Sequence, residues 1–194
     1  CTGMDALTHA IEAYVSTANS PITDLHALEA IRLITAHLTG AVANPQSIDH
    51  QGPMMLASLE AGLAFSNAIL GAVHAMAHSL GGCFDLPHGE CNAILLPGVV
   101  AFNYSACPDR FDRVAAVMGV AVEQIPAAER AGKLVARIAA LRSSVGIGDN
   151  VRQFGVAKTD VARLAGFALQ DACMATNPKP MERRDVEAIY EAII

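Results

Sequence analysis

The sequence predicts an all-α fold, a helical bundle in which residues 1–194 form one domain. Apolar residues return every three or four positions in nine segments, the spacing of amphipathic helices. No segment of useful length alternates apolar and polar residues as a strand does. The hydrophobic fraction of 53% against a charged fraction of 16% requires much of the chain to be buried.

The N-terminal half contains four predicted helices. The first begins at Thr2 or Gly3 and runs through Tyr14. Asn19-Ser20-Pro21 then ends one helix and provides an N-cap and a first-turn proline for the next. The second helix ends at Gly40 and Asn44-Pro45, and the third and fourth cover residues 51–66 and 69–80, before Gly81-Gly82.

Turn composition in residues 85–89 predicts that His88 lies in a loop before the next helix. That helix covers residues 91–100 and is interrupted by Pro97. The remaining helices are predicted at residues 108–118, 127–141, 158–169 and 182–193. Residues 120–125 are too few to indicate a strand, and residues 143–155 form the loop that we expect to be most mobile.

Composition limits the classes of partner. A net charge of -6 with only 13 Lys and Arg residues provides no basic stripe for a phosphate backbone, so we expect no nucleic-acid partner. The five cysteines include no CxxC pair, which favours a reducing, cytoplasmic environment over a disulfide framework. The chain begins with Cys and no charged-then-apolar leader follows, so we expect a fragment boundary and no secretory signal.

The stretch between Glu60 and Asp85 contains no formal charge over 24 residues, a length that could span a bilayer. However, it contains five polar residues, Ser66, Asn67, His74, His78 and Ser79. Polar groups inside a membrane are costly. We therefore expect a buried central helix and no membrane partner.

Asp5 and His9 are four residues apart, and His74 and His78 repeat this spacing, which places each pair on one helix face. His88 follows His74 by fourteen residues. One carboxylate with several imidazoles suits Fe(II) or Zn(II) and does not suit Ca(II) or Mg(II). Taken alone, a pair such as Asp5/His9 is usually a helix-surface pair, whereas His74 and His78 are as consistent with hydrogen-bonded core histidines as with metal ligands.

Three segments closely resemble signature segments of the iron-containing alcohol dehydrogenases: CTGMDALTHAIEAYV (residues 1–15), GAVHAMAHSLGG (residues 71–82) and PHGECNAILLP (residues 87–97). The resemblance implies the helical C-terminal domain of a dehydroquinate synthase-like fold. It also implies that Asp5, His9, His74 and His88 bind the metal, and that His78 faces the nicotinamide as the cofactor-binding and catalytic histidine. Phe65, Asn67 and Cys173 are expected near the substrate.

The implied function is the interconversion of a small alcohol and an aldehyde or ketone with NAD or NADP, using Fe(II) or, alternatively, Zn(II). Family members begin with an α/β nucleotide-binding domain bearing a glycine-rich turn, and no such turn precedes Cys1. We therefore expect half a site, with the upstream domain as the missing partner. The apolar face left exposed is expected to favour a homo-oligomer.

Three other functions are considered. A helical metal phosphohydrolase commonly uses an adjacent His-Asp dipeptide, which this sequence lacks. A zinc-dependent lyase or polyol dehydrogenase of the same fold typically uses fewer protein ligands than one Asp and three His. The third alternative is a non-catalytic metal-binding module.

Overall fold

The computed structural model describes residues 1–194 and contains nine α-helices, five short 3-10 helices and no strand, which confirms the all-α prediction. The α-helices are α1 (Thr2–Val15), α2 (Pro21–Ala43), α3 (Ile48–Ala68), α4 (Ala72–Phe84), α5 (His88–Asn103), α6 (Pro108–Val117), α7 (Ala127–Ser144), α8 (Val161–Ala168) and α9 (Arg183–Ile193). The 3-10 helices are η1 (Tyr104–Ala106), η2 (Val122–Gln124), η3 (Arg152–Phe154), η4 (Lys158–Asp160) and η5 (Ala172–Thr176).

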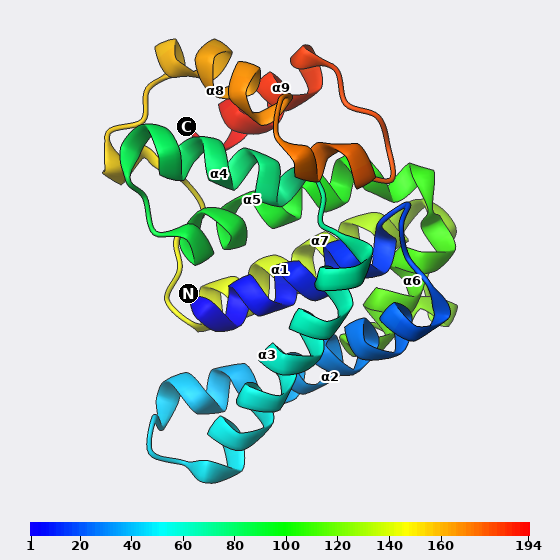
Figure 1. Cartoon of the computed structure of the whole chain (residues 1–194). Helices are drawn as coiled ribbons and strands as arrows, with labels where there is room; N and C mark the ends of the chain where they lie inside the picture. The colour runs from blue at the N-terminus through cyan, green and yellow to red at the C-terminus, as the bar shows by residue number, and fades with distance from the viewer.

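The first helix in the chain lies in the middle of the bundle (Figure 1). α1 packs against the α2–α3 hairpin on one side and against α5 on another. α4 packs against α5 and α8, and α9 packs against α5 and α8. The far end of the α2–α3 hairpin projects away from the other helices (Figure 1).

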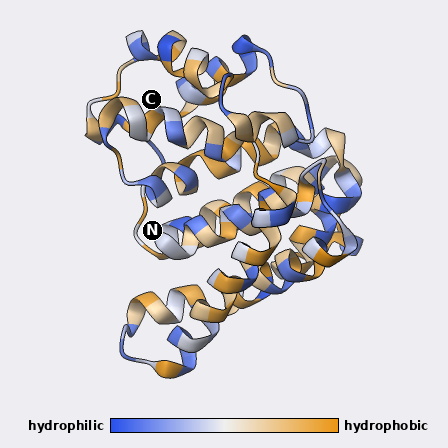
Figure 2. Ribbon diagram, in the orientation of Figure 1, coloured by the Kyte–Doolittle hydropathy of each residue, from blue (hydrophilic) through white to orange (hydrophobic).

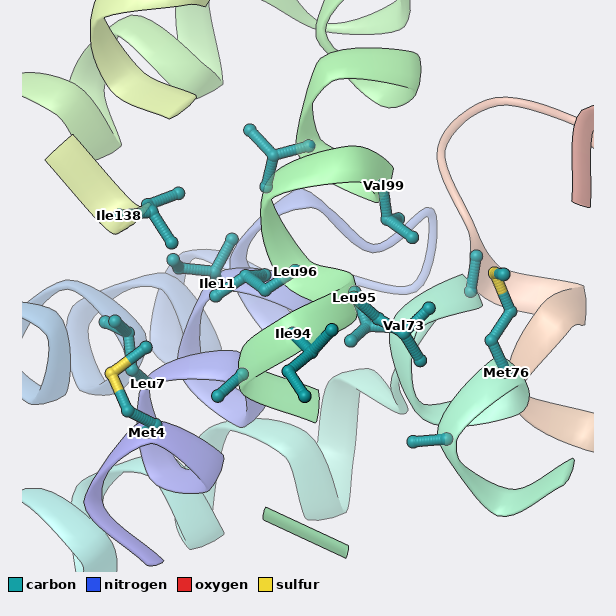
Figure 3. Close-up of a cluster of buried hydrophobic side chains, with 14 of the residues drawn as sticks. Met4, Leu7, Ile11, Val73, Met76, Ile94, Leu95, Leu96, Val99 and Ile138 are labelled. Atoms are coloured by element: carbon teal, nitrogen blue, oxygen red, sulfur yellow. The ribbon is translucent and has the colours of Figure 1, made fainter. Parts of the chain in front are cut away.

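The core joins the three helices on which the candidate site residues lie. Figure 3 shows apolar side chains of α1, α4 and α5 pointing toward one another: Met4, Leu7, Ile11, Val73, Met76, Ile94, Leu95, Leu96 and Val99, with Ile138 of α7 beside them. All of them are buried. Interiors of this kind are close-packed, so the relative positions of α1, α4 and α5 are fixed by side-chain packing.

The prediction that the fourth helix begins at Ile69 is wrong. Ile69 is the C-cap of α3, with φ 61° and ψ -166°, and its N–H donates to the Phe65 carbonyl. α4 begins only at Ala72, after the extended N-cap Gly71. The uncharged stretch is divided between two helices, as predicted, but the break lies at residues 69–71 and not at residues 67–68.

No single helix is long and apolar enough to cross a membrane. The pair α3 and α4 passes that test of length and composition together, with a bend of 101° between them. His74 is 1% exposed and α4 is buried along most of its length, as expected for a central helix.

Two helix boundaries near the candidate site also differ from prediction. Gly81 and Gly82 lie inside α4, which ends at Phe84 with Asp85 in the left-handed conformation. A glycine costs only about 1 kcal/mol inside a helix, which packing can offset. His88 is the first residue of α5 and does not lie in a loop, although its Pro87 N-cap provides the expected turn.

Pro97 does not interrupt α5, which continues to Asn103. An internal proline removes one backbone hydrogen bond and costs about 3 kcal/mol. Buried residues lie on both sides of it, Leu95, Leu96, Val99 and Val100, and their packing offsets this cost. The irregular segment predicted at 143–155 is shorter, because α7 extends to Ser144 and η3 follows.

The start of α2 follows the prediction. Ser20 caps α2 by accepting from the Thr23 N–H, with Pro21 in the first turn. The α2–α3 hairpin is joined by His26 Nδ1, 2.5 Å from Glu60 Oε2, and by a contact between His37 and His50. His26, His37 and His50, which lie outside the signature segments, thus contact residues of the neighbouring helix and lie away from the candidate metal ligands.

The outer face of α3 is unusually apolar. The residues that α3 buries are small, Ala57, Ala61, Ala64 and Ala68, whereas Met55, Leu59 and Leu63 are exposed. The orange that marks hydrophobic residues accordingly continues onto the projecting hairpin (Figure 2). The hairpin thus presents an apolar surface of the kind that usually marks a contact with another protein surface.

Candidate metal centre

The structure brings together the four residues expected to bind a metal. Asp5 and His9 come from α1, His74 from the first turn of α4, and His88 from the start of α5. One ligand atom from each residue lies within 4.8 Å of the others. The i, i+4 spacing points Asp5 and His9 from one face of α1, and the packing of α4 and α5 against α1 brings the two remaining imidazoles to them.

The carboxylate lies between the imidazoles. Asp5 Oδ1 is 3.5 Å from His88 Nε2 and 3.7 Å from His74 Nε2. The His9 ring stacks on the His74 ring with centroids 4.5 Å apart, and Phe65 stacks against His9 at 4.4 Å. Phe65 of α3 therefore helps to hold the His9 ring in place.

The protonation equilibria suit a site for a cation. Burial, together with the charge of His74, lowers the pKa of His9 to about 4, and burial also lowers the pKa of His88. Burial alone would raise the pKa of Asp5, but His74, His9 and Asn92 outweigh it and lower the pKa to about 2. At neutral pH the carboxylate is ionised and these two imidazoles are neutral, as metal ligands must be.

His74 differs because carboxylates lie on both sides of its ring. Burial would lower its pKa, but Asp5 and Glu12 raise the pKa to about 9. The two carboxylates thus strongly favour positive charge at this point, whether it is supplied by a proton or by a metal ion.

The contacts of Asn92, on α5, indicate whether these residues fit a metal ion. Its Nδ2 lies 2.6 Å from Asp5 Oδ1, 3.0 Å from His88 Nε2 and 3.2 Å from His74 Nε2. These atoms offer more lone pairs than one amide group has N–H bonds to satisfy. The Asn92 Oδ1 atom is buried without a hydrogen-bond partner. One carboxylate and three imidazoles around such a point fit Fe(II) or Zn(II).

His78 lies at the exposed rim of the cluster. Its ring stacks on His88 with centroids 5.3 Å apart, and its Nδ1 lies 2.8 Å from Asp171 Oδ2. The His78 side chain is 43% exposed. It also lines a cavity of about 290 Å³ with Ala75, Ser79, Gly82, Cys83, Phe167 and Asp171. The structure thus brings His78 next to the cluster but turns it toward solvent.

Of the three residues expected near the substrate, two lie at the cluster or its rim. Phe65 contacts His9, and Cys173 lies beside Asp171, whose Oδ1 accepts from the Cys173 N–H. Burial and Asp171 raise the pKa of the Cys173 thiol to about 12, so it is a poor nucleophile. Asn67 is not brought to the cluster: its side chain donates to the Leu63 carbonyl on another face of α3.

Sequence reasoning missed two residues of this region, Glu12 and Asn92, and it did not pair Asp171 with His78. Glu12 could have been noticed because it follows Asp5 by seven residues and so lies on the same face of α1. Asn92 follows His88 by four residues, which gives a similar signal. Asp171 lies in a segment that resembles the family's closing segment near the pocket, but no local pattern predicts its contact with His78, which joins residues 93 positions apart.

Comparison with known proteins agrees with the helical fold. The chain matches the model of the Fe-containing alcohol dehydrogenase family, C-terminal, over residues 1–194. It is 44% identical over 189 residues to the 1,3-propanediol dehydrogenase of Klebsiella pneumoniae, covering 97% of this chain and 49% of that protein. It is 38% identical over 190 residues to the NAD-dependent methanol dehydrogenase of Bacillus methanolicus, covering 98% and 50%.

A crystal structure of 1,3-propanediol oxidoreductase superposes with a TM-score of 0.97 at 44% identity, covering all of this chain and 50% of that one. The chain therefore spans about half the length of the relatives that it matches. The match of the family model over the full chain, with these identities and this fold, shows that the chain belongs to the Fe-containing alcohol dehydrogenase family.

Proposed function

We propose that this chain is the metal-binding half of a dehydrogenase that interconverts a small alcohol and an aldehyde or ketone with NAD or NADP. Asp5, His9, His74 and His88 hold one divalent ion, with Fe(II) the first candidate and Zn(II) the second. The convergence of these four side chains within 4.8 Å carries the proposal. The relatives named 1,3-propanediol dehydrogenase and NAD-dependent methanol dehydrogenase support the reaction class.

The bound ion would polarise a substrate carbonyl or stabilise an alkoxide, and the nicotinamide would exchange the hydride. The protein residues hold and orient these groups. Phe65 keeps the His9 ring in position, and Asp171 accepts from the His78 ring at Nδ1. The other nitrogen of His78 remains free to contact the nicotinamide or to carry a proton to or from the substrate oxygen.

Residues 1–194 form one helical domain in this proposal, and an upstream nucleotide-binding domain completes the active site. His88 and His78 have side-chain exposures of 42% and 43%, so the rim of the cluster faces outward. Binding sites for small molecules and cofactors commonly lie between two domains. The half-length coverage of the relatives supports a second half that binds the cofactor.

Metal binding is the first test. The purified chain, dialysed and loaded anaerobically with Fe(II) or with Zn(II), is expected to retain one ion per chain in elemental analysis. Asp5→Ala and His88→Ala should each abolish retention, because each removes a ligand. His37→Ala is a matched control, since His37 contacts His50 in the α2–α3 hairpin. Equal retention by all variants would rule out the proposed ligands.

Activity separates the proposal from its alternatives. The chain alone should oxidise no alcohol with NAD, because the nucleotide-binding half is required, and addition of that half should produce turnover. NAD-dependent oxidation by the chain alone would contradict the division of the site. Phosphatase activity with added Mn(II) would instead favour a metal phosphohydrolase.

A further inference from the structure

Glu12 is a buried carboxylate one turn beyond His9 on α1. It is 4% exposed, and acidic side chains are rarely buried to this degree unless they are paired. Asp5, His9 and Glu12 share one face of α1, which directs all three toward α4 and α5. The burial of Glu12 therefore needs partners beside the cluster.

The two oxygens of Glu12 contact two different groups of α4. Oε2 lies 2.5 Å from His74 Nδ1, and Oε1 accepts from the Val73 N–H at 2.6 Å. A carboxylate only accepts hydrogen bonds, so His74 Nδ1 must carry a proton and donate it. The other ring nitrogen, Nε2, then points to Asp5 and Asn92.

Glu12 cannot easily change its position. The neighbouring Ala72 N–H donates to Asn177 Oδ1, so Glu12 and Asn177 together cap the start of α4. A Cβ atom at Gly71 would lie 2.9 Å from Glu12 Oε1 and 3.1 Å from Asn177 Oδ1, which explains a glycine at this N-cap. The backbone of α4 thus locks the carboxylate against the His74 ring.

We propose that Glu12 is a positioning residue of the metal centre: its contact with Nδ1 fixes the tautomer and orientation of His74, so that Nε2 presents its lone pair to the metal. This inference rests on the proposed metal-binding function. A histidine ligand that donates its second nitrogen to a carboxylate binds metal more strongly, and loss of such a partner typically weakens metal binding by about 10–100-fold. Glu12 therefore acts on the metal through His74 and makes no bond to it.

Glu12→Gln separates positioning from helix capping. Glutamine has one acceptor for the two donors that Glu12 satisfies. If its oxygen accepts from Val73, its amide group donates to Nδ1 and favours the tautomer with the proton on Nε2, where that proton blocks the metal. We expect the dissociation constant for Zn(II), measured by competition with a chelator, to rise by about 10–100-fold.

Asn177→Ala is the matched structural control. It removes the cap at Ala72 in the same turn of α4 without contacting His74. It should lower the melting temperature while leaving the dissociation constant within a few-fold of the original. Similar metal affinity for Glu12→Gln and the unsubstituted chain, or equal weakening by Asn177→Ala, would overturn the inference.

The tautomer can also be read without any substitution. In the Zn(II)-loaded chain, ¹⁵N NMR of the His74 ring should show a protonated Nδ1, and a protonated Nε2 would overturn the inference even if Glu12→Gln fails to fold. Failure of the unsubstituted chain to bind Zn(II) would instead defeat the proposed function. The two failures are therefore distinguishable.

Discussion

Tyr190 is a single side chain that joins the last helix to the helix bearing His74. It is fully buried, and its hydroxyl donates to the Met76 carbonyl at 2.8 Å. Tyr190→Phe should lower the free energy of unfolding by about 1 kcal/mol, the usual net value of one buried hydrogen bond. Urea denaturation would measure this change, and an unchanged midpoint with an unchanged slope would contradict it.

At the residue scale, the sequence spacing predicted which candidate ligands share a helix face but not which faces meet. The pairs Asp5/His9 and His74/His78 are fixed by helix geometry alone. Their assembly into one cluster with His88 was implied by the family resemblance. Glu12 was not predicted, because its contact with His74 joins residues 62 positions apart and depends on how α1 packs against α4.

At the break between α3 and α4, one residue adopts a backbone conformation that its side chain disfavours. Ile69 has φ 61° and ψ -166°, a region occupied almost only by glycine, and its side chain is 44% exposed. Such a conformation costs about 1–3 kcal/mol for other residues. The 101° bend between the two helices is built on this residue.

Ile69→Gly should therefore raise the free energy of unfolding by about 1 kcal/mol, because the relief of strain exceeds the entropic cost of a glycine. Thermal and urea denaturation would measure the gain. Ile69→Ala is the control: it removes the same exposed side chain but keeps a Cβ atom. An equal gain in both variants would show that the side chain, and not the backbone, is responsible.

At the element scale, nine helices could be predicted because each has a regular apolar spacing. The boundaries near the site could not, since glycines at 81 and 82 and a proline at 97 weaken a helix locally without deciding its end. At Pro97, buried neighbours on both sides keep the helix continuous. The exact end of α4 depends on the positive φ of Asp85, which the spacing of apolar residues does not predict.

The whole molecule leaves the apolar outer face of α3 exposed. Leu59 is 59% and Met55 74% exposed, on the hairpin that projects from the bundle (Figure 1). We expect the chain to self-associate through this face as its concentration rises, since exposed apolar patches favour association. Sedimentation velocity over a concentration series would measure it.

The double variant Met55→Lys/Leu59→Lys should keep the chain monomeric with little change in melting temperature. Phe167→Lys, which replaces an exposed apolar residue of α8, is the control and should leave association unchanged. Association that persists in the double variant would place the contact elsewhere. This whole-molecule property could be anticipated only in outline, because the sequence did not indicate which helix keeps its large apolar residues outside.

The central position of α1 has a consequence for the order in which the protein is made. Asp5, His9 and Glu12 leave the ribosome before their partners on α4 and α5, which are synthesised some 60–80 residues later. Asn177, which caps the start of α4, emerges later still. The buried contacts of these three side chains can therefore form only after α4, α5 and the segment that contains Asn177 have been synthesised.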